Sequence, residues 1–217
     1  MLYYHPEYIP DIKWEVNMTS KIIGSLLILG TILTMGVWMF FGVDTDNMSP
    51  SDKLNVLIAN KSQIQITTFV TTFGFACLII GLHYLSRKLS DHILSEIGGL
   101  ILIAMLPLII SINMSDLVAL ESEKLYSNGA AILTAVTAFD YGFLAMMAGI
   151  FLIGAGLAIE KKIGKGIIGV LLAICSAIAI LSEVGLGAFD AVAFIGWLGT
   201  WLLFLVTGIF AFLQEEN

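Results

Sequence analysis

The sequence predicts an all-α membrane protein, a polytopic bundle of six transmembrane helices in one integral membrane domain, residues 1–217. Apolar residues make up 58% of the chain and charged residues only 12%, which is outside the range of soluble domains. The mean hydropathy is +0.95. Six apolar runs have the length of about 20 residues that a helix needs to cross a bilayer. They are residues 22–43, 64–85, 97–113, 141–159, 163–181 and 191–213.

The segment before the first run is expected to lie at the membrane surface. Residues 1–20 carry Tyr3, Tyr4, Tyr8 and Trp14 among charged residues, and such rings collect at the level of the lipid headgroups. The segment lacks the basic region and the cleavage site of a signal peptide. We therefore expect an interfacial tail followed by a retained membrane anchor.

Lys and Arg residues divide unevenly between the two sides of the six spans. One side has seven, Lys13, Lys21, Arg87, Lys88, Lys161, Lys162 and Lys165, and the other has three, Lys53, Lys61 and Lys124. Because the side richer in Lys and Arg faces the cytoplasm, both termini are predicted to be cytoplasmic. Most of the net charge of −7 then lies on the outer surface, which argues against nucleic acid as a partner.

The two long external loops, residues 44–63 and 115–128, show helical patterns. Ser49 or Ser51 can cap a short helix in the first loop, and Asn128 with Gly129 forms a turn or stop signal after the second. Apolar residues recur at helical spacing in both: Leu54, Leu57 and Ile58, then Leu117, Leu120 and Leu125. We therefore expect a small helical cap on the outer face.

Small residues are expected to form the helix-packing faces of the fourth and fifth spans. These residues are Gly142, Ala145, Gly149 and Gly156, followed by Gly166, Gly169 and Ala173. Stripes of small residues let helix backbones approach closely in a bilayer. The two spans are therefore predicted to be close-packed neighbours or to face a partner subunit.

Polar residues in the outer half of the bundle outline a candidate cavity. Pro107 is the only proline in a predicted span and should kink its helix. The candidate lining residues are Asp140, Asn113, Ser111 and Thr71. This cavity is an alternative to simple packing of the same residues.

Asp140 is the only charge in the long apolar run from residue 129 to residue 159. It lies twenty residues before Glu160 and the lysines that follow, or ~30 Å along a helix. We therefore expect Asp140 at the outer membrane edge. The uncharged residues 129–139 should project beyond the membrane, covered by the external loops or by a partner.

The sequence lacks the residue combinations that the common catalytic and metal sites of membrane proteins need. Of three histidines only His83 lies in a span, and no span pairs two acids, so neither a haem, a multi-histidine metal site nor aspartyl chemistry can be built inside the chain. No nucleophile has a histidine partner at its depth. The sequence predicts no catalytic residue, no cofactor and no metal ion.

Two stretches carry a resemblance to a known family. LIANKSQIQITTFV at the start of the second span and FDYGFLAMMAGIFLIGAGLAI in the fourth resemble a family of prokaryotic six-helix membrane proteins, domain of unknown function 4386. The resemblance runs from about Asn55 to Gly208. It implies the six-helix layout and, for this chain, a prokaryotic cell membrane; it assigns no activity.

Three functional hypotheses follow. The first is a non-catalytic structural or accessory subunit of a larger membrane complex, held in the lipid bilayer and contacting other subunits through the cap and the small-residue faces. The alternative is a small transporter or channel with an outward-facing polar cavity near Pro107, Asn113 and Asp140. The third, an enzyme using external acids and a borrowed metal, ranks last.

Overall fold

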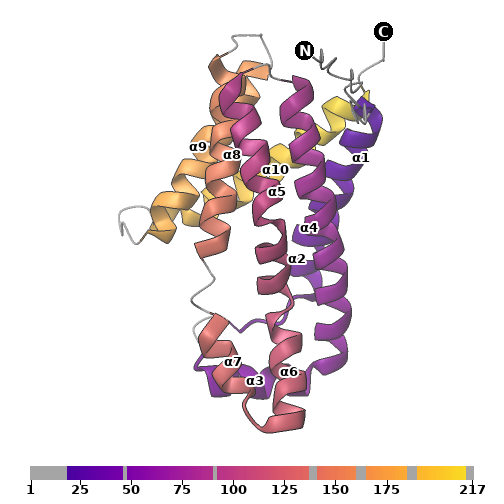
Figure 1. The fold of residues 1–217 in the computed structure, drawn as a ribbon, viewed down its shortest axis with the longest axis vertical. Coiled ribbons are helices and arrows are strands. Elements are labelled where there is room, and N and C mark those ends of the chain that lie inside the picture. Colours follow the sequence, from indigo (N-terminus) through magenta and orange to yellow (C-terminus); the bar gives the residue numbers. More distant parts are fainter. Residues whose placement is uncertain are drawn as a thin grey trace, which may run out of the picture.

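The computed structural model describes residues 19–45, 48–89, 92–136, 141–159, 165–184 and 190–213, and the regular structure within these ranges is helical (Figure 1). The first span has three consecutive parts: α1 (Ser20–Thr31), the π-helical η1 (Ile32–Gly36) and α2 (Val37–Phe41). The others are α4 (Lys61–Leu89), α5 (Ile93–Asn113), α8 (Tyr141–Ile159), α9 (Lys165–Glu183) and α10 (Asp190–Leu213). In the described ranges six helices are long and apolar enough to cross a membrane. The predicted all-helical class and its six spans are confirmed, and the chain is a multi-pass membrane protein.

The six spans form a closed ring in chain order. Each packs against the next, from α1 to α4, α5, α8, α9 and α10, and α10 returns to α1. Figure 1 shows α10 crossing the bundle obliquely, so that its C-terminal end lies beside the start of α1 and its other end lies beside α9. This crossing closes the ring at the end where α1 begins.

Glycines allow the helices of the ring to touch backbone to backbone. A Cβ on Gly24 of α1 would lie 2.5 Å from the backbone nitrogen of Phe212 in α10. A Cβ on Gly98 of α5 would lie 2.4 Å from the carbonyl oxygen of Gly149 in α8. Side chains at these positions would force the helices apart, so the small residues fix both contacts.

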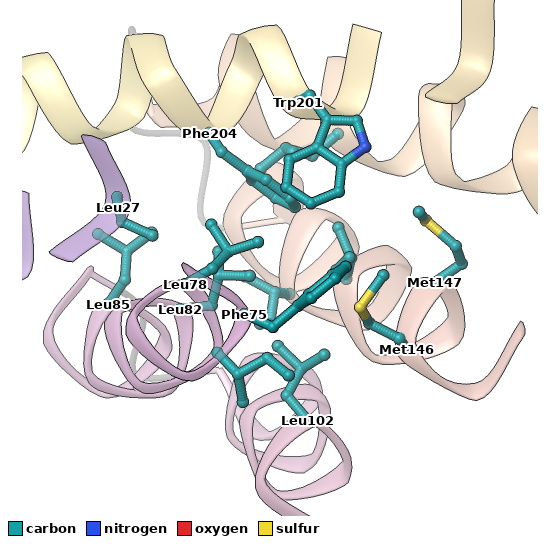
Figure 2. Close-up of a cluster of buried hydrophobic side chains, with 14 of the residues drawn as sticks. Leu27, Phe75, Leu78, Leu82, Leu85, Leu102, Met146, Met147, Trp201 and Phe204 are labelled. Atoms are coloured by element: carbon teal, nitrogen blue, oxygen red, sulfur yellow. The ribbon is translucent and has the colours of Figure 1, made fainter. Parts of the chain in front are cut away.

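Large apolar side chains fill the ring from its middle to the end where α1 begins. Leu27, Leu78, Leu102, Met146 and Phe204 come from five different spans, and none is more than 1% exposed. Figure 2 shows the α10 side chains in this core pointing towards those of α4 and α8. This end of the ring is closed by packed side chains.

Three short helices pack together at the opposite end of the bundle, which we call the three-helix end: α3 (Pro50–Ala59), α6 (Ser115–Tyr126) and α7 (Gly129–Val136) (Figure 1). Ser49 caps α3 by accepting a hydrogen bond from the Asp52 amide. A second apolar cluster holds these helices against α4; its residues are Leu54, Leu57, Ile64, Ala119, Leu120 and Leu133. That this end faces outwards and that both termini are cytoplasmic stay predictions.

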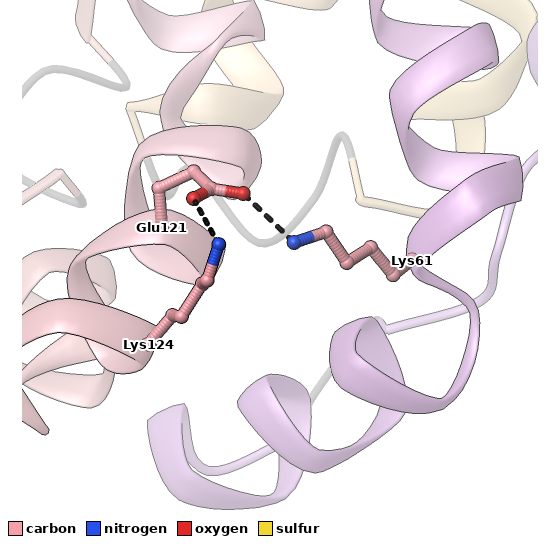
Figure 3. Close-up of polar contacts among 3 residues, drawn as sticks. All are labelled: Lys61, Glu121 and Lys124. Carbon is pink, nitrogen blue, oxygen red and sulfur yellow. Dashed lines mark hydrogen bonds and ion pairs between the residues drawn. The ribbon is translucent and has the colours of Figure 1, made fainter.

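Ion pairs connect the helices of the three-helix end with one another and with α4. Lys53 lies 3.0 Å from Asp116, between α3 and α6. Lys61 of α4 donates a hydrogen bond of 2.8 Å to Glu121 of α6, and Lys124 lies 3.9 Å from the same carboxylate (Figure 3). The hydrogen bond and charge of Lys61, with a smaller contribution from Lys124, lower the pKa of Glu121 below its ordinary value of 4.5.

The stretch before the fourth span differs from its expected form. Residues 129–136 form the separate helix α7, which packs on α3 and α6. Leu133 is 5% exposed there, whereas Ala131, Thr134 and Ala135 form the exposed face. A separate helix can turn its large apolar side chains onto α3 and α6, and a straight extension of α8 would leave them in water. The chain's own helices thus cover this stretch; Asp140 lies outside the described residues.

Candidate functional site: a cavity inside the helix ring

A cavity of about 510 Å³ lies inside the ring, between the packed core and the three-helix end. Every span contributes to its lining. Representative residues, in chain order from the first span to the sixth, are Thr34, Thr71, Asn113, Phe143, Glu183 and Trp201. We call this space the ring cavity. Because all six spans contribute, its shape depends on how the whole ring is packed.

Asn113, the last residue of α5, provides a polar wall. Its side-chain nitrogen donates to the hydroxyls of Thr71 and Thr72 in α4, at 3.0 Å and 2.6 Å, and to the Thr68 carbonyl at 3.2 Å. Two of the predicted cavity residues, Thr71 and Asn113, therefore lie side by side in the lining. Sequence reasoning missed Thr68 and Thr72, although the threonine pairs in QITTFVTTF repeat at helical spacing.

Aromatic side chains make up half of the described lining residues. Phe75 of α4 lies 6.0 Å from both Phe143 of α8 and Trp201 of α10, measured between ring centroids, and Phe143 lies 6.3 Å from Trp197. Contacts at this distance between tilted rings are favourable. Sequence reasoning missed this wall; its signal was Phe194, Trp197 and Trp201 at spacings of three and seven along α10.

The ring cavity is open on the side where the first and sixth spans diverge. The two helices touch at Gly24 and Gly208, near the start of α1, and Figure 1 shows them separating towards the three-helix end. Trp38 and Phe194 belong to the lining, yet they are 61% and 62% exposed. These two rings therefore mark the rim of a lateral opening between α2 and α10.

The π-helical segment η1 faces the ring cavity through Thr34 and Met35. The Thr34 hydroxyl donates to the Gly30 carbonyl at 2.7 Å, and the Thr31 hydroxyl donates to the Leu27 carbonyl at 2.8 Å. Short π-helical segments occur frequently at functional sites. The first run of the sequence shows no proline, so this irregularity had no signal there.

A second, smaller cavity of about 250 Å³ adjoins the first. It lies between the end of α5 and the three-helix end, and its lining includes Lys53, Asp116 and Leu133. Asn113 and Phe143 line both cavities. These two side chains therefore separate the ring cavity from the ion-paired region beside α3 and α6.

Of the two other predicted residues of the site, the structure describes only Ser111, which does not line the cavity. Ser111 is exposed, and its hydroxyl donates to the Pro107 carbonyl at 2.8 Å rather than lining the cavity. Helix α5 continues through Pro107. Asp140 is outside the described residues, so its part in the cavity stays a prediction.

The predicted packing residues of the fourth span face the third span. Cβ atoms on Gly142, Gly149 and Gly156 would meet Leu108, Gly98 and Ser95 of α5, respectively. Ala145, the other member of this stripe, is half-buried. The stripe therefore belongs to the contact with α5.

Contact between the fourth and fifth spans uses a different glycine. A Cβ on Gly154 of α8 would lie 2.7 Å from the Ala173 nitrogen and 2.8 Å from the Gly169 carbonyl oxygen of α9. Gly166 has no such neighbour closer than 4.0 Å among the residues that the structure describes. The two spans are neighbours, and Gly169 and Ala173 lie at their contact.

The fold and the cavity define a class of protein, a six-span membrane helix bundle with an internal cavity. Among the described side chains, no three His, Cys, Asp or Glu residues lie close enough together to hold a metal ion. No family model, curated protein or solved structure matches the chain. The resemblance to the six-helix family stays a prediction.

Proposed function

We propose that the protein binds a small amphipathic molecule in the ring cavity and acts as a small membrane transporter. The observation that carries this proposal is the lining of the cavity by all six spans. Its volume of about 510 Å³ falls in the range typical of ligand pockets. Its mostly apolar lining with a few polar side chains is also typical of such pockets. A ligand held there contacts every span, so its binding can favour one packing of the ring over another.

The two ends of the ring support a transport role. The cavity opens between Trp38 and Phe194, whereas core side chains close the opposite end. Trp38 and Phe194 lie near the three-helix end of their spans, so the cavity opens near one end of the bundle and is closed towards the other, as alternating access requires of each of its states. Opening the other end requires α1 and α10 to separate near Gly24 and Gly208.

Binding can be tested with a variant that fills the cavity. Thermal unfolding of the purified protein is followed by tryptophan fluorescence in the presence of cationic, neutral and anionic amphipathic compounds, because a ligand of the folded state raises the midpoint. Leu198→Trp adds an indole to the lining. Leu202→Trp is the matched control, on the same helix but with its side chain 53% exposed.

We expect at least one class of compound to raise the midpoint of the native protein and of Leu202→Trp, but not of Leu198→Trp. The binding proposal fails if no class does so, or if Leu198→Trp responds like the native chain. Transport is then tested by uptake of the stabilising compound into proteoliposomes. Binding without uptake would reject the transporter and retain only a binding protein.

A second candidate, the accessory subunit, is favoured by exposed apolar side chains at the three-helix end. Ile58, Val118, Leu125 and Tyr126 are between 50% and 74% exposed there, beyond the six spans. Extraction from the native membrane in a gentle detergent should then yield a copurifying membrane protein that Leu125→Glu releases. Recovery of the native chain alone would remove this candidate.

A further inference from the structure

We infer that the ring cavity selects organic cations that have an apolar body. This inference rests on the proposed function, because it names the ligand class of the same cavity. It depends on the charge, the hydrogen-bonding groups and the aromatic rings of the lining.

Among the described residues of the ring cavity's lining, Glu183 is the one with an ionisable side chain. It is the last residue of α9 and is exposed. Backbone carbonyls at a helix C-terminus already carry partial negative charge, so an acid there does not stabilise its own helix. The carboxylate of Glu183 and the C-terminal end of α9 together give the cavity a negative electrostatic potential.

No basic group of the described chain compensates Glu183. Within the described ranges its carboxylate has no ion pair, and the lysines at the three-helix end pair instead with Asp116 and Glu121. Arg87 and Lys88 lie in the last turn of α4, at the far end of that helix. A cation in the cavity would supply the missing positive charge.

The polar wall offers acceptors to a ligand. The hydroxyl of Thr34 donates to the Gly30 carbonyl, and that of Thr71 donates to the Thr67 carbonyl at 2.8 Å. The amide group of Asn113 donates to groups in α4. These side chains therefore offer a ligand oxygen lone pairs, which accept hydrogen bonds. The remaining donors of the described lining are the tryptophan N–H groups, which are neutral. The described part of the lining therefore lacks the cationic donors that an anion would need.

The aromatic wall favours a cation for an independent reason. Ring faces carry negative electrostatic potential and attract a cation within about 6 Å. The rings of Phe75, Phe143, Trp197 and Trp201 contact one another at interplanar angles from 55° to 74°. Their planes therefore differ in direction around the space, and the same rings provide apolar contact for the body of the ligand.

Three probes of similar shape separate charge from apolarity. Tetraphenylphosphonium is the cation, tetraphenylborate has nearly the same shape with the opposite charge, and triphenylphosphine oxide is neutral. Binding to the purified protein is measured by equilibrium dialysis in a non-ionic detergent, with empty micelles subtracted. Quenching of tryptophan fluorescence is a second readout, since three of the chain's four tryptophans line the cavity.

Glu183→Gln removes the charge and keeps the shape of the side chain. The control is Glu96→Gln, an exposed acid in the first turn of α5, at the opposite end of the bundle. We expect the native chain and Glu96→Gln to bind tetraphenylphosphonium at least about tenfold more tightly than tetraphenylborate. Glu183→Gln should weaken binding of the cation about fivefold to tenfold, and Glu183→Lys should reverse the preference.

The outcomes distinguish this inference from the proposed function. Equal binding of all three probes, no binding of any, or unchanged cation binding in Glu183→Gln would overturn the inference. If Leu198→Trp still abolishes binding of a neutral or anionic compound, the cavity remains a ligand site without cation selectivity. If Leu198→Trp leaves all binding unchanged, the cavity is not the site and the proposed function fails as well. Unfolding midpoints of the variants show that each is folded.

Discussion

Gly98→Ala should separate the third and fourth spans and destabilise the bundle. The new methyl group would lie 2.4 Å from the carbonyl oxygen of Gly149. That oxygen belongs to the backbone of α8, so no side-chain rotation can move it away. To reach the ordinary contact distance of 3.4 Å, the two helices must separate by about 1 Å.

The magnitude follows from two opposed effects. Overpacking a closed contact costs about 1–3 kcal/mol, and the upper value applies because backbone faces backbone. Alanine recovers about 1 kcal/mol through its higher helix propensity. We therefore expect a net loss of about 2 kcal/mol in the free energy of unfolding.

Gly166→Ala is the matched control for this substitution. Among the described residues its methyl group would have no neighbour nearer than 4.0 Å, so only the helix propensity remains and the variant should gain up to about 1 kcal/mol. Reversible unfolding in mixed micelles measures both variants. Equal stability of the two, or a Gly98→Ala variant more stable than the native chain, would refute the packing of α5 on α8.

Three further substitutions give independent tests by the same unfolding assay. Asn113→Leu should cost about 1 kcal/mol, because the hydrogen bonds from α5 to the threonines of α4 are lost; an unchanged stability would contradict that contact. Since the pKa of Glu121 is lowered in the fold, its ion pair stabilises above pH 4.5 and is lost as the pH falls through the lowered pKa. Lys61→Met should therefore be less stable than the native chain at about pH 7, and this difference in stability should shrink as the pH falls through the lowered pKa; a difference that does not change with pH would exclude the pair. Ser127 has φ = 54°, so Ser127→Gly should gain about 0.5–1 kcal/mol, and a loss would exclude the left-handed backbone there.

The sequence predicts the spans well because two local properties, the length and the polarity of a segment, determine whether it can cross a membrane. Length and polarity mark an apolar run that a charged or polar segment ends, and the described helix α8 covers the predicted span, residues 141–159. Of the two candidate N-cap residues of α3, Ser49 is the one that caps the helix. The separate helix α7 was missed because the apolar run of residues 129–159 does not show that its first part packs as a helix of its own.

Glycine stripes predict close approach without naming the neighbour. Gly149 was assigned to a contact with the fifth span or a partner, and it faces Gly98 of the third. The stripe on α8 is one property of one helix, whereas the neighbour depends on the order of all six spans around the ring. That order is not a local property of the sequence.

The cavity was predicted only in its polar part. Thr71 and Asn113 stood out because polar side chains are costly inside a membrane, and they do meet. The helical spacing of Trp197 and Trp201 was a weaker signal, since aromatic rings in a span also face lipid or the membrane interface. Their inward position depends on the oblique crossing of α10, which the contact at Gly24 sets.

Labelling of single cysteines along α10 tests the ring cavity most directly. In a chain whose Cys77 and Cys175 are replaced by alanine, a cysteine is placed at Leu198 in the lining, at Leu202 on the exposed face, or at Phe204 in the core, where exposure is 1%. A small water-soluble thiol reagent needs water to reach the thiolate. If the ring cavity exists, Leu198→Cys should be labelled fast, and a bound ligand should slow this labelling. The cysteines at positions 202 and 204 should be labelled little. Equal labelling of all three positions, or none at position 198, would contradict the existence of the ring cavity.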